Sequence, residues 1–351
     1  MLPQDSPAQI PLANAWLTLK RGDRSEKTFR HLTIAQPKSA AAWQGLSLAL
    51  YQQQKWYEAT LAAWQASRLA PQNPSSRYLL GSSVLAYAQQ FPNENHDTEM
   101  RLARAQFLTL THAWPDNPEV LYKLGQACLG ASQFGEAIQN LRRALALSPR
   151  PDIAWELAHA YLLQGNTTAA WQVVDTALAR DPDDAALHDL RGQILQNSNA
   201  AQSLSEYQTA VRLEPNSSRF LECEAAALLR AGQLPEARAA FEQVIRLNPT
   251  RAFPYQQIAF IETRLGNPAA AALAARQAAV KNADSESLLH LQTQSSHQTN
   301  DAVLHLQLAA RYQKLGLTGA ARDEYLVALR LKPGNVQARQ GLAILKVPLP
   351  Q

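Results

Sequence analysis

Histidine, cysteine and carboxylate side chains are the groups through which this chain could do chemistry. Their densest cluster lies in the polar segment QQFPNENHDTEM and consists of Glu94, His96, Asp97 and Glu99. Imidazole and carboxylate groups hold zinc when they converge with cysteines or with one another at characteristic spacings. The remaining histidines of the chain are not at such a spacing. We interpret the segment as a solvated loop and expect no metal site.

Motifs for catalysis and phosphate binding are missing as well. The segment 129–132 contains a single glycine and is expected to be a turn between helices, not a phosphate-binding loop. No Gly-x-Ser-x-Gly nucleophile motif occurs, and chance explains the pair His297 and His305, which stand eight residues apart. We therefore expect no enzyme activity, no small-molecule substrate and no cofactor.

The composition is that of a folded chain with little net charge. Of its 351 residues 46% are hydrophobic, and the formal net charge is +4 with lysines and arginines scattered along the sequence. A pI near 9.1 alone would favour a nucleic-acid partner, but no basic run supports one. No stretch approaches the roughly 18 uninterrupted apolar residues of a membrane helix. The first residues show no charged region followed by an apolar core, so no secretory signal is expected.

A recurring proline shows how the rest of the chain is organised. Most neighbours in this series are 33 or 34 residues apart. An alanine twelve residues upstream, a bulky residue eight upstream and a small apolar residue five upstream precede nearly every copy, as in Ala137-Leu141-Ala144-Pro149. Internal repetition at this period predicts a stack of similar units. The series is Pro37, Pro71, Pro115, Pro149, Pro182, Pro215, Pro249 and Pro333.

Residues 118–150 form the clearest copy. Leu121 and Leu124 belong to an apolar set with helical spacing, and a second set with the same period ends before Pro149. Proline cannot continue a helix, so it turns the chain into the next unit. Gly125 stands where one helix must approach another closely. Each unit is therefore expected to be a helix–turn–helix.

This pattern resembles the tetratricopeptide repeat, a helix–turn–helix of 34 residues, and the resemblance covers about nine-tenths of the chain. It implies an all-α fold, a right-handed superhelical solenoid of about eight helix–turn–helix repeats with a C-terminal capping helix. The composition, rich in Ala, Leu, Gln and Arg, resembles that of bacterial repeat proteins. The expected divisions are a degenerate N-terminal repeat at 1–39, a repeat array at 40–285, a linker or hinge at 286–301, and the final repeat and capping helix at 302–351.

Two departures from the period and two cysteines complete this organisation. Ten extra residues near 87–100, polar and containing a proline, are expected to form an enlarged inter-helix loop, to which a lengthened helix can contribute. In 286–301 a short apolar cluster precedes a Gln/Ser/Thr-rich stretch, which predicts a partial helix and a flexible joint. Cys128 and Cys223 fall in units three repeats apart, too far for a disulfide. Both are expected to be buried free thiols.

The resemblance also implies a binding surface. In this family the first helices of the repeats line the concave face of the superhelix, where partners lie. The corresponding positions here are aromatic, amide-rich and nearly neutral, and aromatic side chains with polar tips are typical interface anchors. Packing between neighbouring units is the alternative for any one of them. The predicted partner-binding residues are Tyr78, Tyr122, Gln126, Trp155, His159, His188, Phe253, Gln256, Phe260 and Arg264.

Some members of the family hold a C-terminal carboxylate with a clamp of Lys, Asn and Arg residues. Those positions carry Tyr122, Gln126, Trp155 and His159 in the best-formed adjacent units, so the clamp is not expected. A partner that docks as an apolar extended segment or an amphipathic helix fits this surface better.

These observations favour a non-catalytic scaffold that binds a protein partner along the groove. Two alternatives stay open. One is a subunit of a bacterial envelope assembly, pilus, secretion or polysaccharide-export machine within a membrane-associated complex. The other is a regulator that binds a peptide or nucleic acid, for which a continuous basic stripe would be expected. We expect a cytoplasmic location, or a periplasmic or envelope location if an upstream signal has been removed.

Overall fold

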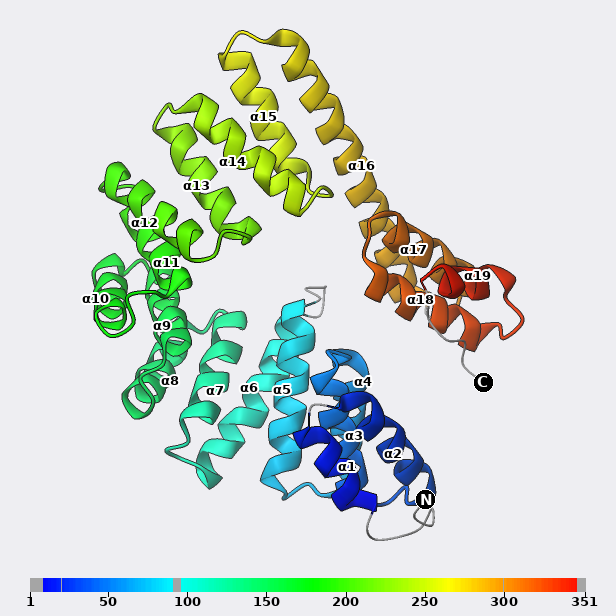
Figure 1. Cartoon of the computed structure of the whole chain (residues 1–351). Helices are drawn as coiled ribbons and strands as arrows, with labels where there is room; N and C mark the ends of the chain where they lie inside the picture. Colours follow the sequence, from blue (N-terminus) through cyan, green and yellow to red (C-terminus); the bar gives the residue numbers. More distant parts are fainter. Residues whose placement is uncertain (1–8, 20, 91–95, 299, 346–351) are drawn as a thin grey trace. The chain divides into compact units, whose positions relative to one another are not determined.

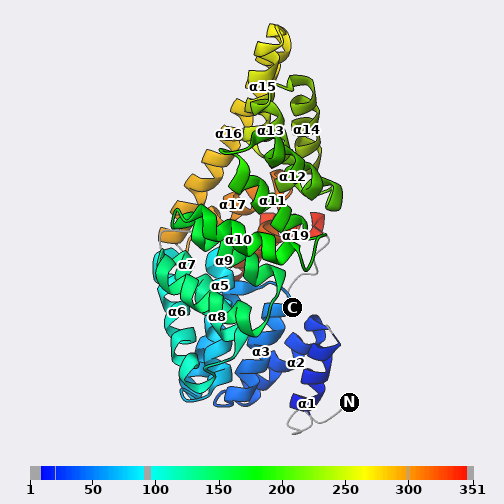
Figure 2. The same ribbon diagram turned by 90° about the vertical axis from the view of Figure 1, so that its left-hand side faces the viewer.

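The chain forms two compact units, Met1–Ile194 and Leu195–Gln351. The computed structural model describes residues 9–19, 21–90, 96–298 and 300–345. Helices account for 81% of the chain, and no strand occurs among the described residues. In both units, antiparallel helices joined by short turns stack one after another (Figures 1 and 2). The expected all-α solenoid of repeated helical hairpins is confirmed.

Unit 1 consists, in its described part, of five helical hairpins and one further helix. In each hairpin a first helix packs against a second, and the second also packs against the first helix of the next hairpin. The helices are α1 (Gln9–Thr18), α2 (Gly22–Ala35), α3 (Ala40–Gln52), α4 (Trp56–Leu69), α5 (Pro74–Gln90), α6 (His96–Ala113), α7 (Pro118–Gly130), α8 (Phe134–Leu147), α9 (Pro151–Leu163), α10 (Thr167–Leu178) and α11 (Ala185–Leu195).

Unit 2 continues the same packing with three hairpins between two single helices. Each helix packs against the one that follows it in the chain, from the first of them to the last. The helices are α12 (Ala200–Leu213), α13 (Ser218–Arg230), α14 (Leu234–Leu247), α15 (Ala252–Arg264), α16 (Pro268–His297), α17 (Ala302–Lys314), α18 (Thr318–Leu331) and α19 (Val336–Ile344).

Helix caps explain why the proline recurs where it does. Two residues after the proline, a polar side chain accepts a hydrogen bond from the first turn of the next helix: Ser39 from the N–H of Ala42, and Asn335 from the N–H of Ala338. Such caps satisfy backbone donors that a helix start leaves free. The Pro-x-polar pattern therefore ends one helix and begins the next.

The carbonyl of the same proline also accepts a side-chain hydrogen bond. In several turns the donor stands six residues later, at the start of the next first helix. In others the donor comes from the following second helix, as when Arg143 of α8 donates to Pro115. Ala283 stands in the place of the missing proline, and its carbonyl accepts from Arg311 of α17. These bonds satisfy carbonyls left free at helix ends. The remaining pairs are Trp43–Pro37, Arg77–Pro71, His188–Pro182, Gln243–Pro215, Tyr255–Pro249 and Arg339–Pro333.

The extra residues near 87–100 mainly lengthen two helices. The helices α5 and α6 contain 17 and 18 residues, whereas α7 and α8 in the next hairpin contain 13 and 14. Residues 91–95 lie outside the described residues. A lengthened helix is therefore part of the insertion, and Ala88, a good helix former, lies in the extended end of α5.

The joint expected at 286–301 is largely helical instead. The helix α16 is 30 residues long and runs from Pro268 to His297. Its N-terminal half packs against α15 and its C-terminal half against α17 (Figure 1). No proline or glycine occurs between 269 and 297, and Ala283 stands where other repeats have proline. Nothing in this stretch stops a helix, so the turn between the two halves is lost.

The boundary between the compact units also differs from the expected divisions. It falls between Ile194 and Leu195, within the predicted repeat array at 40–285, so that α11 closes unit 1 and α12 opens unit 2. The cysteines are both free thiols, but only Cys128 is buried as expected, and Cys223 is half-buried.

Candidate functional site

The first helices of unit 1 lie against one another: α5 contacts α7, and α7 contacts α9. We call the surface that they share the α5–α7–α9 face, and define it by seven half-buried or buried residues from these helices. Six of the ten predicted partner-binding residues are in unit 1, and five of them belong to this face. Its residues are Tyr78, Tyr122, Lys123, Gln126, Trp155, Glu156 and His159.

Gln126 joins the polar side chains of this face. Its amide oxygen accepts a hydrogen bond from Nζ of Lys123 at 3.2 Å. Its amide nitrogen donates to the hydroxyl of Tyr122 at 3.0 Å and to Oε1 of Glu156 at 2.8 Å. Because Glu156 is on α9 and the other three are on α7, this amide ties two neighbouring repeats together.

Tyr122 contributes to the face mainly by positioning its neighbours. Its side chain is only 7% exposed, and two cations lie near its ring, with Nζ of Lys123 5.3 Å and Cζ of Arg150 5.5 Å from the ring centre. Cations are attracted to the negative face of an aromatic ring. The ring therefore holds Lys123 beside Gln126, while little of Tyr122 itself is open to a partner.

Burial perturbs both charged ends of this network. It raises the pKa of Glu156, and the hydrogen bond from Gln126 and the charge of Lys123 offset only part of the effect. Burial likewise lowers the pKa of Lys123, although the negative charges of Glu119 and Glu156 act to raise it. Desolvation disfavours the charged form of any group. The face thus holds an ammonium and a carboxylate, each partly stripped of water.

A separate ion cluster borders this network. Arg150, in the turn before α9, donates to Glu119 of α7 at 2.9 Å and also pairs with Asp152. Burial raises the pKa of Asp152, but its bonds with Arg150 outweigh that effect and the pKa is lowered. These charges neutralise one another locally, so they are less available than Glu156 for a partner.

Aromatic rings complete the face. The ring of Trp155 lies 5.0 Å from that of His159, tilted by 31°, and Tyr78 meets Phe107 edge-on at 6.0 Å. All but Phe107 are first-helix residues and half-buried. Offset and edge-on ring pairs of this kind fix their members in place. Trp155 and His159 therefore offer a rigid ring surface beside the carboxylate of Glu156.

His188, the sixth predicted residue of unit 1, has a different surrounding. Its Nε2 donates to the carbonyl of Pro182 at 2.8 Å, the bond that recurs at other turns of the chain. The structure therefore gives this half-buried side chain a role in closing the turn before α11.

The other four predicted residues lie on α15 of unit 2. Phe253 and Phe260 are 39% and 52% exposed, and Gln256 and Arg264 are exposed as well. The guanidinium of Arg264 lies 5.8 Å from the ring of Phe260, and Phe253 meets Phe241 edge-on at 6.2 Å. They form a second, separate exposed stripe of first-helix side chains.

Sequence reasoning missed Lys123 and Glu156. The family pattern indicates single positions spaced four apart, such as Tyr122 and Gln126, and neither Lys123 nor Glu156 stands at such a position. A signal was present: each charged residue directly follows an aromatic residue that the sequence predicts to bind the partner, Tyr122 or Trp155. Only the folded structure shows that the two charges meet the same amide.

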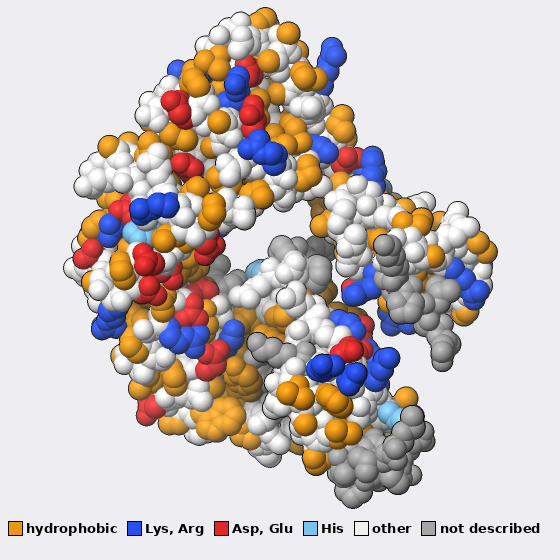
Figure 3. Space-filling view, viewed as in Figure 1, with side chains coloured by type: hydrophobic (Ala, Val, Ile, Leu, Met, Phe, Trp, Pro, Cys, Tyr) orange, Lys and Arg blue, Asp and Glu red, His pale blue; other side chains and the backbone are white. Residues whose placement is uncertain are grey.

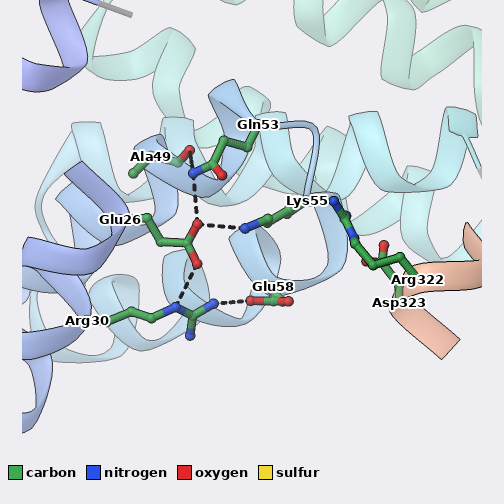
Figure 4. A network of polar contacts seen from close by, with 8 residues as sticks. All are labelled: Glu26, Arg30, Ala49, Gln53, Lys55, Glu58, Arg322 and Asp323. Carbon is green, nitrogen blue, oxygen red and sulfur yellow. Dashed lines mark hydrogen bonds and ion pairs between the residues drawn. The ribbon is translucent and has the colours of Figure 1, made fainter. Parts of the chain in front are cut away.

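Another buried carboxylate, Glu26, has no open position for a ligand. Arg30 and Lys55 each lie 2.7 Å from its oxygens, and Gln53 donates to it at 2.8 Å (Figure 4). Burial raises the pKa of Glu26, but the hydrogen bonds from Lys55 and Arg30 outweigh burial, so the pKa is lowered. Arg30 also pairs with Glu58. This cluster joins α2 to α4 and its turn, and we interpret it as structural.

Among the residues that the structure describes, no three His, Cys, Asp or Glu side chains gather in a way that could hold a metal ion. Of the earlier cluster, His96, Asp97 and Glu99 lie at the start of α6, and Glu94 is outside the described residues. None of the described helices is both long enough and apolar enough to span a bilayer.

Family models of the tetratricopeptide repeat match residues 99–150, 129–194 and 195–252. The chain is a tetratricopeptide repeat protein. Repeat arrays of this kind are in general non-catalytic scaffolds for protein interactions, with extended surfaces on which partners bind.

Known proteins with the same repeats resemble the chain at low identity. The anaphase-promoting complex subunit CDC16 of Saccharomyces cerevisiae is 22% identical over 225 residues, which are 62% of this chain and 26% of that protein. The chain thus spans about a quarter of the length of this curated relative.

Two solved structures show the same fold. One is a tetratricopeptide repeat protein from Parabacteroides merdae, with a TM-score of 0.58, 14% identity, and coverage of 72% of this chain and 97% of that one. The other is a human IFIT1 dimer with PPP-AAAA, with a TM-score of 0.52, 16% identity, and coverage of 92% and 82%. At these identities the likeness concerns the fold alone.

Proposed function

We propose that this tetratricopeptide repeat protein is a non-catalytic scaffold that binds a partner protein across the α5–α7–α9 face. The observation that carries the proposal is the network around Gln126, where Lys123 and Glu156 are half-buried next to the rigid rings of Trp155 and His159. Such a face combines ring surface with a few fixed polar groups, the composition of a protein-binding hot spot.

The partner is an extended segment rather than a rigid surface. Lys123 makes one hydrogen bond, to Gln126, and Oε1 of Glu156 accepts one from the same amide. The ammonium keeps further donors and the carboxylate further acceptors, as their chemistry dictates. The backbone of an extended chain offers carbonyls to the first and N–H groups to the second, and its apolar side chains would lie against Trp155 and Tyr78.

The charges and the relatives support a protein as the partner. Over α7 to α9 basic and acidic side chains alternate (Figure 3), whereas a nucleic-acid site needs a continuous basic surface. CDC16 is, by its name, a subunit of a larger complex. A role for this chain within an assembly of proteins is consistent with that relative.

The test compares the loss of two tryptophan side chains, one on the α5–α7–α9 face and one outside it. Trp155→Ala removes a ring of the face, and Trp64→Ala removes a ring of α4 that is 46% exposed and belongs to a second helix. After the partner has been identified by affinity capture, its affinity for the purified variants is measured by calorimetry. Loss of a central aromatic anchor costs about 2 kcal/mol or more, roughly a thirtyfold weaker complex.

Circular dichroism first establishes that both variants keep the helical content of the native chain. The proposal expects Trp155→Ala to weaken binding and Trp64→Ala to leave it unchanged. Unchanged affinity in a folded Trp155→Ala variant would place the binding surface elsewhere. Lys123→Ala and Glu156→Ala, tested in the same way, show whether the polar pair contributes.

A further inference from the structure

Glu156 differs from the buried carboxylates elsewhere in the chain in what it pairs with. Glu26, Glu262 and Asp284 each have an arginine 2.7 to 3.1 Å away. Glu156 is half-buried, and its Oε1 accepts a hydrogen bond from the neutral amide of Gln126 at 2.8 Å. It forms no ion pair with any residue that the structure describes, and its Oε2 accepts no hydrogen bond from them. This second oxygen is therefore left for a partner.

The full charges around Glu156 do not balance. In α7, α9 and the turn before α9, three carboxylates accompany two cations. Arg150 is shared by Glu119 and Asp152, and Lys123 meets the amide that also binds Glu156. The region therefore carries one negative charge in excess. Its charged residues are Glu119, Lys123, Arg150, Asp152 and Glu156.

An extended segment that lies across the α5–α7–α9 face would remove Glu156 still further from water. Burial already raises the pKa of this carboxyl, because the ionised form loses solvation. A backbone N–H of the segment would supply a hydrogen bond but no charge. A charge that is buried without a counter-charge is strongly destabilising. A cation in the segment would remove that cost.

Building on the proposed function, we propose that the segment bound by the α5–α7–α9 face carries a basic side chain that pairs with Oε2 of Glu156. The rings of Trp155 and His159, 5.0 Å apart on α9, lie beside that carboxylate, and an aromatic ring attracts a cation to its face. Arginine fits better than lysine, because its planar guanidinium binds a carboxylate and also stacks on a ring. Such a pair sets the register of the segment and disfavours acidic ones.

A peptide array provides the test. The probes are short synthetic peptides of random sequence, and the full chain is compared with Glu156→Gln and Glu224→Gln. Glu156→Gln removes the charge and keeps an acceptor for Gln126. Glu224→Gln is the matched control, because Glu224 is also half-buried with a pKa raised by burial, but lies on α13 outside the face. Circular dichroism first establishes that each variant keeps the native helical content.

The native chain and Glu224→Gln should retain peptides enriched in arginine or lysine at one position. Glu156→Gln should lose this preference and bind the selected arginine peptides about tenfold more weakly or worse, because the charged partner is missing. Replacing the arginine of such a peptide by glutamine should weaken its binding to the native chain by a similar factor. The same replacement should leave its binding to Glu156→Gln unchanged, since the pair is already broken.

Trp155→Ala separates this proposal from the proposed function. If the native chain retains the same peptides as Trp155→Ala, or retains none, the α5–α7–α9 face does not bind an extended segment and both proposals fail. If binding requires Trp155 but the retained peptides show no excess of basic residues, only the basic side chain is overturned. The same conclusion follows if Glu156→Gln keeps the preference of the native chain.

Discussion

The carboxylate of Asp284 lies 2.9 Å from the guanidinium of Arg311 and joins the middle of α16 to the last turn of α17. Lys314 approaches the same oxygen at 3.2 Å. Arg311 also donates to the carbonyl of Ala283 at 3.4 Å. One arginine therefore holds α17 to the point of α16 at which the other repeats turn.

Removing this carboxylate should destabilise unit 2. Asp284 is 8% exposed and Arg311 mostly buried, so Asp284→Ala leaves a cation without its partner. Such a change costs more than the 0–1 kcal/mol of a surface pair and less than the 3–5 kcal/mol of a fully buried one, about 2 kcal/mol. Urea unfolding of the full chain measures it. Asp116→Ala breaks an exposed pair with Arg143 and should change stability by less than about 1 kcal/mol.

Restoring the missing proline should break α16. Ala283→Pro removes a backbone donor and places the ring against the carbonyl one turn earlier, at a cost of about 3 kcal/mol or more. Ala283→Gly is the control, because it keeps the donor and costs about 1 kcal/mol. Helical content from circular dichroism and the unfolding midpoint measure both. If the two variants lower the helical content and the unfolding midpoint equally, the stability of α16 does not depend on a continuous helix at residue 283.

Two glycines of the repeat should respond differently to substitution by alanine, because their surroundings differ. A Cβ at Gly125 would lie 2.5 Å from Cγ of Leu141, whereas a Cβ at Gly135 would meet nothing within 4 Å. Gly125→Ala should therefore destabilise the chain by about 1–3 kcal/mol through overpacking. Gly135→Ala should stabilise it by up to about 1 kcal/mol, because alanine favours the helix. Thermal unfolding compares the two, and destabilisation of both would contradict the packing argument.

The raised pKa of Glu156 predicts a pH-dependent stability. A carboxyl whose folded pKa is raised holds its proton more tightly in the folded chain. Its contribution is complete below the unfolded pKa, about 4.3, and is lost as pH rises through the folded value. Glu156→Gln removes this titration and keeps an acceptor for Gln126. The free energy of unfolding of the native chain, relative to the variant, should therefore fall between about pH 4 and about pH 7.

If the difference in the free energy of unfolding between the native chain and Glu156→Gln is the same at about pH 4 and at about pH 7, Glu156 is not desolvated in the way that its burial indicates.

The proline series and its helical spacing were enough to predict the hairpins and most of their bounds. Local rules decide both features: proline ends a helix, and the polar residue two places later begins the next one. The arrangement of the α5–α7–α9 face was predicted less well. Trp155 and His159 do lie together on it, but His188 closes a turn at Pro182 instead. The position of a residue within the repeat indicates which way its side chain faces, but it does not indicate which neighbouring residue the side chain contacts.

The sequence by itself therefore determined the repeat, the class of fold and the places where the period breaks, because these depend on residues close together in the chain. Only the tertiary structure decided what the breaks become. The absence of one proline leaves α16 as a continuous helix. It also decided that Lys123 and Glu156, 33 residues apart, meet at Gln126, because contacts between repeats depend on how whole helices pack.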